Sequence, residues 1–111
     1  MVNREIKFRV WDIHLKKYIK WESMLCHSFQ SKDYVYQQYT GLKDKNDVEV
    51  YEGDVVEWKN NFSGKIVWSK EDVAFIFKSN TGGAAFLTEI YIDNFCVIGN
   101  IFENKDLFEN L

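Results

Sequence analysis

Short stretches of alternating hydrophobic and polar residues run along this chain, separated by polar or glycine-marked breaks. In the first stretch, Ile6, Phe8 and Val10 alternate with charged residues, which is typical of a strand with one buried face. The polar residues 12–17 allow a turn, and Tyr18–Trp21 can return as the second strand. The pattern therefore predicts an N-terminal β-hairpin whose inward face carries Ile6, Phe8 and Val10.

The remaining pattern predicts many more short strands. Residues 22–33 have no period and are expected to be irregular, with room for one helical turn over 23–26. Strands are then expected at 34–39, 48–51, 55–58, 65–68, 73–78, 91–92 and 95–98. Gly41 is expected to break the first of these strands, and Gly53 to supply a turn with a positive φ. Three of the strands, 55–58, 65–68 and 73–78, are joined by short polar turns and should form a meander. Residues 84–88 fit either a strand or a helical turn, and Asn104 can cap a final helical turn through 107–108.

Many short strands at near-regular spacing predict a mostly β protein. A partly open, SH3-like barrel is the preferred architecture, because closure leaves the fewest exposed strand edges in a small domain. The expected fold is this barrel with an N-terminal β-hairpin extension and a short C-terminal helical turn. Residues 1–33 would form the hairpin and an irregular linker suited to self-association, and residues 34–111 the barrel. The length of 111 residues suits one core.

Composition favours a folded, cytosolic protein. With 46% hydrophobic and 17% aromatic residues, the chain has ample apolar surface for a core. It has no apolar run long enough to span a membrane and no apolar leader at its start, so we expect neither a membrane partner nor secretion. The cysteines Cys26 and Cys96 form no CxxC pair and are interpreted as free thiols of a reducing compartment.

The charges are unevenly distributed, although the net charge is only −3. Six basic and two acidic residues give the first twenty positions a charge of +4, which leaves −7 for the rest. Such asymmetry suits nucleic-acid contact, head-to-tail pairing of subunits, or a hairpin that is simply solvated. The solvated hairpin is the preferred interpretation, because charge clusters usually keep a surface wet.

No common catalytic signature is present: the chain lacks a phosphate loop, GxSxG, HExxH and a calcium loop. Four carboxylates cluster around one turn and could form an acid/base pair or a magnesium site: Glu49, Glu52, Asp54 and Glu57. Asp54 is more simply explained as bonding the backbone of its own turn. Two cysteines and two histidines could form a zinc set, Cys26, His27, His14 and Cys96, but they lack the paired spacing of structural zinc sites. We therefore expect no catalytic residue, metal or cofactor.

The four tryptophans are the best candidates for a binding surface. Trp58 and Trp68 end neighbouring strands and could share one barrel face, and Trp11 and Trp21 could pair across the hairpin. Aromatic residues supply most of the burial in a small core, so burial is favoured for them. Trp11 is the expected exception, because its neighbours already occupy the inward face. The candidate partner-binding or self-association set is Arg9, Trp11, Lys16, Lys17 and Trp21, with Trp58 and Trp68 on the barrel face.

Four ordered segments resemble the YopX family of small phage and prophage proteins: Lys7–Asp12, Tyr39–Asp44, Tyr51–Val55 and Ile98–Asn104. Asp47 departs from the family pattern, in which glycine would be expected. The resemblance implies a phage or prophage gene product of the bacterial cytoplasm, with a β-barrel and an N-terminal region for self-association, and it brings no activity. The motif residues are expected to be structural: Tyr39, Thr40, Gly41, Leu42, Asp44, Tyr51, Glu52, Gly53, Asp54, Gly99, Asn100 and Glu103.

Three functions follow as hypotheses. The first is a non-enzymatic accessory module that forms a homo-oligomer and contacts a host or phage macromolecule. The second is nucleic-acid binding through the basic hairpin, which a pI near 5.4 disfavours. The third is a hydrolytic or small-molecule-sequestering protein of phage-host conflict, with the carboxylates of residues 49–57 or an aromatic pocket as its site.

Overall fold

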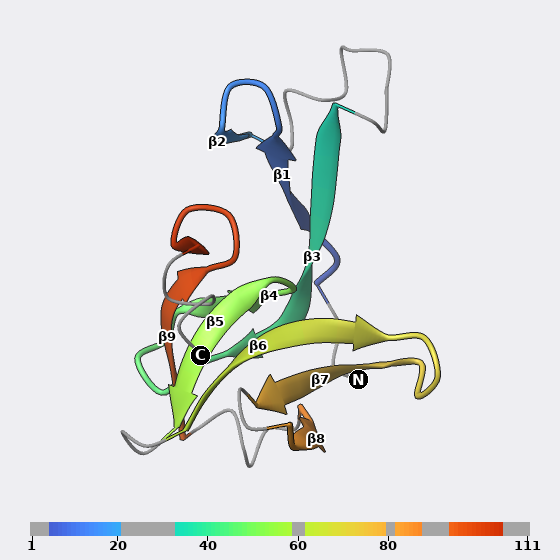
Figure 1. The fold of residues 1–111 in the computed structure, drawn as a ribbon, viewed down its shortest axis with the longest axis vertical. Coiled ribbons are helices and arrows are strands. Elements are labelled where there is room, and N and C mark those ends of the chain that lie inside the picture. Colours follow the sequence, from blue (N-terminus) through green and yellow to red (C-terminus); the bar gives the residue numbers. More distant parts are fainter. Residues whose placement is uncertain (1–4, 21–32, 59–61, 80–81, 88–93, 106–111) are drawn as a thin grey trace.

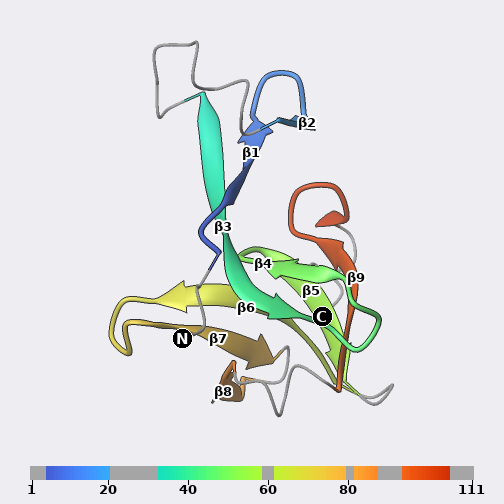
Figure 2. The ribbon, with the colours of Figure 1, turned by 180° about the vertical axis from the view of Figure 1, so that it is seen from behind.

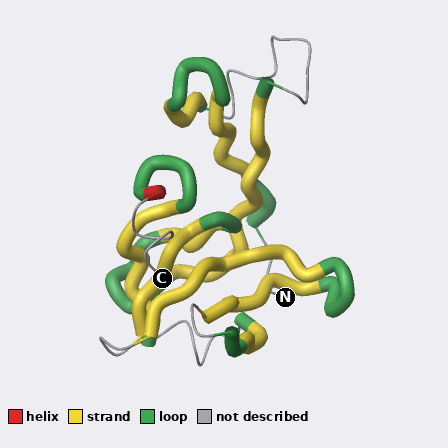
Figure 3. The backbone as a smooth tube through the Cα atoms, viewed as in Figure 1, coloured by secondary structure: helices red, strands yellow, loops and turns green. Residues whose placement is uncertain are grey.

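The computed structural model describes residues 5–20, 33–58, 62–79, 82–87 and 94–105. Nearly all regular structure in these residues is strand, as the sequence predicts (Figures 1 and 3). The strands are β1 (Phe8–Asp12), β2 (Lys17–Ile19), β3 (Tyr34–Lys43), β4 (Glu49–Tyr51), β5 (Asp54–Trp58), β6 (Phe62–Ser69), β7 (Ala74–Ser79), β8 (Ala84–Phe86) and β9 (Phe95–Asn100). The mostly β prediction is confirmed.

The first sheet has the strand order β2-β1-β3-β4, and all its pairs are antiparallel. The predicted hairpin is confirmed: β1 pairs with β2, with Trp11 opposite Tyr18. The long strand β3 pairs with β1 through residues 34–38 and with β4 through 39–43. The break expected at Gly41 is wrong, because β3 continues through it with a shift of register and a φ of +88°. Glycine therefore bends this strand without ending it.

The second sheet has the order β8-β7-β6-β5-β9 and curls around the core (Figures 1 and 2). The predicted meander is confirmed in β5, β6 and β7. Residues 84–86 form a strand, which decides between the two predicted alternatives. Strand β6 begins at Phe62, three residues earlier than predicted, because residues 62–64 pair with the end of β5.

The hydrophobic core lies between the curled sheet and the β4 end of the first sheet. Its buried members are Val50, Val56, Ile66, Phe77 and Phe95, each at most 5% exposed. Only Val50 comes from the first sheet; the others lie on β5, β6, β7 and β9. The ring centroids of Phe77 and Phe95 are 5.0 Å apart, so the aromatic residues supply much of the burial.

The face pattern of β1 is only partly as expected. Val10 is fully buried, whereas Ile6 is 68% exposed. Trp11, expected to be exposed, is only 7% exposed. Strand β1 lies inside its sheet, between β2 and β3, and the turn after β9 covers the face of the sheet that carries Trp11. Both faces of the middle of β1 are therefore buried.

Several predictions fall on residues that the structure does not describe: most of the irregular segment 22–33, the strand 91–92 and the turn through 107–108. The SH3-like assignment and the division between residues 33 and 34 stay predictions. Within the described part of the chain, no helix is long and apolar enough to cross a membrane.

Candidate functional site

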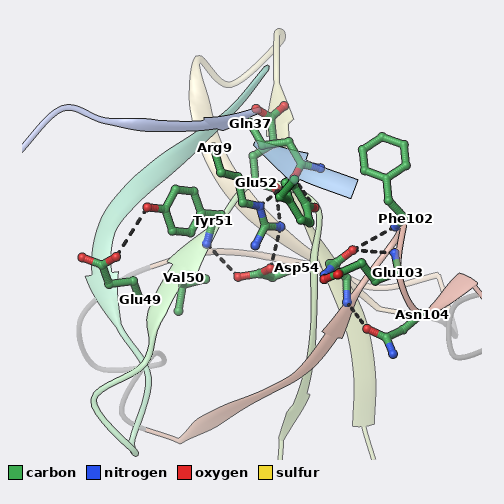
Figure 4. Close-up of polar contacts among 12 residues, drawn as sticks. Arg9, Gln37, Glu49, Val50, Tyr51, Glu52, Asp54, Phe102, Glu103 and Asn104 are labelled. Atoms are coloured by element: carbon green, nitrogen blue, oxygen red, sulfur yellow. Dashed lines mark hydrogen bonds and ion pairs between the residues drawn. The ribbon is translucent and has the colours of Figure 1, made fainter. Parts of the chain in front are cut away.

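One polar network contains a residue from each of the first five strands: Arg9, Tyr18, Gln37, Tyr51 and Asp54. Figure 4 shows four of them, Arg9, Gln37, Tyr51 and Asp54. The Arg9 guanidinium lies between two aromatic rings, with Cζ 4.8 Å from the Tyr18 centroid and 4.9 Å from that of Tyr51. Its Nε donates to Gln37 Oε1 over 2.7 Å, and its Nη2 lies 2.7 Å from Asp54 Oδ1. The network therefore fastens the N-terminal hairpin to the first strand of the curled sheet.

Gln37 is central to this network and is only 3% exposed. Its Oε1 also accepts a hydrogen bond of 2.8 Å from the Tyr18 hydroxyl. A Cβ atom on Gly53 would lie 2.1 Å from Gln37 Nε2, and Gly53 has a φ of +88°. Gly53 is thus required twice, for the left-handed turn predicted from the sequence and for the close approach of Gln37.

Asp54 is 2% exposed and bonds its own turn, as predicted: Oδ2 accepts from the Tyr51 backbone N–H over 2.8 Å. Burial raises the pKa of Asp54, while the nearby charge of Arg9 opposes that rise. Burial also raises the pKa of Tyr18 to about 12. Both tyrosines beside Arg9 remain neutral at physiological pH, since burial raises the pKa of Tyr51 as well.

A cleft of about 440 Å³ opens beside the network, between the edges of β4 and β9 and the turn after β9. Arg9 and Asp54 line it together with Glu49 and Tyr51 from β4. Lys7 forms an ion pair with Glu49. The hydrogen bond between these two side chains is the largest cause of the raised pKa of Lys7. The opposite wall carries Val97, Gly99 and Asn100, with Glu103 and Asn104 beyond them.

The outer end of the hairpin, residues 13–17, stands clear of the curled sheet (Figures 1 and 2). We call it the hairpin tip. Ile13 and Leu15 are 42% and 62% exposed, and Lys16 and Lys17 are exposed beside them. Asp12 Oδ1 fixes the turn by accepting from the backbone N–H groups of residues 14 and 15, each over 2.9 Å. Apolar and basic side chains are therefore displayed together on an ordered turn.

Polar side chains of the segment Tyr39–Asp44 form hydrogen bonds to backbone groups of neighbouring strands and turns. Asp44 is 5% exposed, and its Oδ1 accepts from the N–H groups of Asn46 and Val48 over 2.8 and 2.9 Å. Its Oδ2 accepts from Val97 N–H over 2.9 Å, which ties the β3–β4 turn to β9. Thr40 Oγ1 donates to the Val50 carbonyl over 2.7 Å, Leu42 packs against the core, and the Tyr39 ring lies 5.4 Å from that of Tyr51.

The segment Ile98–Asn104 forms a capped turn. Asn100 Oδ1 accepts from the N–H groups of Phe102 and Glu103 over 3.0 and 2.8 Å, so Asn100 caps this turn. Its Nδ2 donates to Glu103 Oε1 over 2.9 Å. A Cβ on Gly99 would lie 2.6 Å from Asn104 Oδ1. The turn presents Phe102, which stacks on Trp11 with centroids 5.0 Å apart.

The tryptophan pairings expected from the sequence are wrong where the structure describes them. Tyr18, not Trp21, lies opposite Trp11, and Trp21 falls outside the described residues. Trp58 pairs with Phe62 at one end of the β5–β6 ladder, whereas Trp68 lies beyond its other end, opposite Phe75. Trp58 is half-buried against the core and Trp68 is 42% exposed, so they form no common face.

The four carboxylates around the β4–β5 turn do not converge. Glu49 pairs with Lys7, Asp54 pairs with Arg9, and Glu52 Oε1 lies 3.5 Å from the Gln38 backbone nitrogen. Glu57 lies further along β5, opposite Ser63 and Cys96. No group of three metal-ligating side chains is found among the described residues.

The zinc alternative rests partly on Cys26 and His27, which lie outside the described residues. Of its other two members, His14 is exposed and bonds Asp33 over 3.0 Å, while Cys96 Sγ accepts from Asn46 Nδ2 over 3.4 Å. Each therefore has a separate local partner.

Residues 25–109 match the model of the YopX protein family. The chain belongs to the YopX family. The resemblance read from its motifs is thereby confirmed. The chain also shares its fold with protein EF1440 from Enterococcus faecalis: that crystal structure matches with a TM-score of 0.69 and 23% identity, over 95% of this chain and 99% of the other. No curated protein matches it.

Sequence reasoning missed Gln37 and Tyr18 as members of the network. Gln37 lies directly opposite Arg9 in the β1–β3 ladder, and Tyr18 lies directly opposite Trp11. Cross-strand neighbours on one face contact each other, so a correct pairing of the strands would have found both. The signal in the sequence is a long polar residue, Gln37, inside a run of aromatic and β-branched strand residues.

Proposed function

We propose that this YopX-family protein is a non-enzymatic phage or prophage accessory module of the bacterial cytoplasm. It self-associates through its hairpin tip and contacts a host or phage macromolecule. The observation that carries this proposal is the pairing of exposed Ile13 and Leu15 with exposed Lys16 and Lys17 on an ordered turn. Apolar side chains beside charges are typical of protein interfaces.

The anchoring of the hairpin supports the proposal. Arg9 forms its ion pair at the base of the hairpin, and Trp11 stacks on Phe102 a short distance further along. These contacts hold β1 against the body, and the side chains of residues 13–17 stay exposed. A preorganised turn loses less entropy on binding than a flexible one.

The role of the carboxylates supports a binding module over a hydrolase. Asp54 is engaged by Arg9 and by a backbone N–H, and Glu49 is engaged by Lys7. A general base must be free to take a proton from a substrate, whereas these groups already serve the fold.

The nucleic-acid alternative loses two of its supports. Trp11 is buried and cannot stack on a base, and the charges of Lys7 and Arg9 are used in internal ion pairs. Lys16 and Lys17 remain exposed, and they suit a protein surface equally well.

Solution mass by light scattering tests the proposal. The variant Ile13→Ser/Leu15→Ser removes apolar area from the tip and leaves the buried Trp11 intact. Its matched control is Val73→Ser, since Val73 is 72% exposed on the turn between β6 and β7. We expect an oligomer for wild type and control and a monomer of 13.2 kDa for the tip variant. A monomeric wild type at the highest attainable concentration would exclude self-association.

Partner binding is tested by capture from phage-infected lysate with the same three proteins. A host or phage macromolecule should be recovered by wild type and by Val73→Ser. The tip variant should recover it as well, because the tip serves self-association and leaves the rest of the protein for the partner. Recovery of no macromolecule by any of the three proteins would count against the partner contact.

A further inference from the structure

The cleft between β4 and β9 carries an excess of negative charge. Three carboxylates and one guanidinium line it, which gives a formal charge of −2. Asp54 and Arg9 neutralise each other across 2.7 Å, and Lys7 binds Glu49 from beside the cleft. Glu103 receives a hydrogen bond from the neutral amide of Asn100 and has no cationic partner among the described residues. The cleft therefore attracts a positive group near Glu103.

The walls of the cleft also offer apolar contact. Val48 is 46% exposed at the β4 side, and Val97 is half-buried at the β9 side. Aliphatic walls beside a carboxylate suit the methylene stem and ammonium group of a lysine. The complementary ligand is a basic side chain accompanied by apolar neighbours.

The hairpin tip has this composition. Lys16 and Lys17 are exposed, and neither forms an ion pair with any described residue. Exposed Ile13 and Leu15 accompany them. The tip and the cleft thus match in charge and in apolar content.

The tip does not point toward the cleft of its own chain. Strand β1 is paired on both sides, with β2 and with five consecutive residues of β3, so the direction of the tip is fixed. In both ribbon views the tip points away from the turn that follows β9 (Figures 1 and 2). A tip that fills this cleft must come from another molecule.

We infer that the cleft between β4 and β9 is the docking site for the hairpin tip of a second copy of this chain, with Lys16 or Lys17 of that copy paired to Glu103. The inference rests on the proposed self-association and names the surface that receives the tip. Because the two surfaces differ, the contact is head-to-tail and builds a closed ring or an open filament. It gives Lys16 and Lys17, two of the six basic residues in the first twenty, an acidic counterpart.

Charge exchange tests the pairing by light scattering. Glu103→Lys reverses the cleft charge, and Lys16→Glu/Lys17→Glu reverses the tip. Glu71→Lys is the matched control, because Glu71 is an exposed carboxylate on the β6–β7 turn. We expect the wild type and the control to be oligomers of equal mass, and each reversal alone to give a 13.2 kDa monomer. Combining both reversals in one chain restores opposite charges and should restore the oligomer.

The outcomes separate this inference from the proposed function. If reversal of the tip dissociates the oligomer while Glu103→Lys leaves its mass unchanged, the tip docks elsewhere; the inference is then overturned and self-association stands. If the combined variant stays monomeric although both single reversals dissociate, direct pairing of tip and cleft is also overturned. A monomeric wild type overturns both. Circular dichroism of each variant confirms that a loss of mass is not a loss of fold.

Discussion

Replacing Arg9 by Met should make the stability of this protein depend on pH through Asp54. In the wild type, burial raises the pKa of Asp54 above its ordinary value of 3.8, and Arg9 is the main charge that opposes the rise. Methionine keeps an apolar stem between the rings of Tyr18 and Tyr51 but removes the charge. The pKa of Asp54 in the folded protein must then rise further.

The magnitude follows from what the substitution leaves behind. Gln37 Oε1 keeps the hydrogen bond from Tyr18, and Asp54 keeps the one from the Tyr51 backbone. The main loss is therefore the partner of a carboxylate that is 2% exposed. Removing one member of a buried ion pair costs about 3–5 kcal/mol. For a chain of 111 residues this corresponds to a fall in Tm of roughly 15 °C.

The sign of the pH dependence is fixed by the direction of the pKa shift. Because the pKa of Asp54 is higher in the folded than in the unfolded chain, protonation favours the folded state. The free energy of unfolding of Arg9→Met should therefore increase as the pH falls through the folded-state pKa, and level off below the unfolded value of 3.8. The lost stability is thus partly recovered in mild acid.

Urea unfolding followed by tryptophan fluorescence, from about pH 8 to about pH 4, measures this effect as a difference from wild type. The double variant Arg9→Met/Asp54→Asn is the control, since it removes both charges, keeps an amide oxygen to accept from the Tyr51 N–H, and should be closer to wild type than Arg9→Met with no added pH dependence. If Arg9→Met ran parallel to wild type over the whole range, Asp54 would not be the group that Arg9 neutralises, and the reasoning would be refuted.

Three further predictions concern stability, measured by the same urea assay. Gly64→Ala should lower the free energy of unfolding by more than about 3 kcal/mol, because the new Cβ would lie 2.3 Å from a backbone oxygen. Gly82→Ala should lower it by about 1–2 kcal/mol, because Gly82 has open space around it but a φ of +100°. Equal losses in the two variants would contradict the predicted clash at Gly64. Val73→Asn should stabilise by about 1 kcal/mol, since Val73 is exposed and holds a φ of +51° that asparagine tolerates; a loss of stability would argue against strain there. Trp11→Ala should lower the free energy of unfolding by about 3–5 kcal/mol, because Trp11 is buried, and Trp68→Ala by less than about 1.5 kcal/mol, because Trp68 is 42% exposed. A smaller loss for Trp11→Ala than for Trp68→Ala would indicate that Trp11 is exposed.

The sequence predicted correctly the turns and hairpins whose geometry depends on residues close together in the chain. Gly53 marks a turn because few other residues adopt its φ of +88°, and Asp54 bonds the turn that it follows. The alternation around Val10 gave the first hairpin. The break expected at Gly41 failed, because a glycine with positive φ can also form a bulge inside a strand whose ladder continues on both sides.

The candidate site depends on contacts that no local pattern contains. Arg9 was placed on a solvated hairpin, because charge clusters usually keep a surface wet, and among the candidate partner-binding residues. Its partner Asp54 lies 45 positions away and approaches only after β1, β3 and β5 have been assembled. Trp11 is buried for the same kind of reason, since Phe102 reaches it from the far end of the chain.

The ladder between β1 and β3 also sets how this molecule would respond to mechanical load. Five consecutive pairs, from Phe8 with Gln38 to Asp12 with Tyr34, join the strand that carries the hairpin tip to the long strand that continues into the core. A pull on the tip along the strand axis would load all of these pairs in shear at once, whereas a sideways pull would open them one after another. An assembly joined through its tips would therefore be strong along one direction and weak across it.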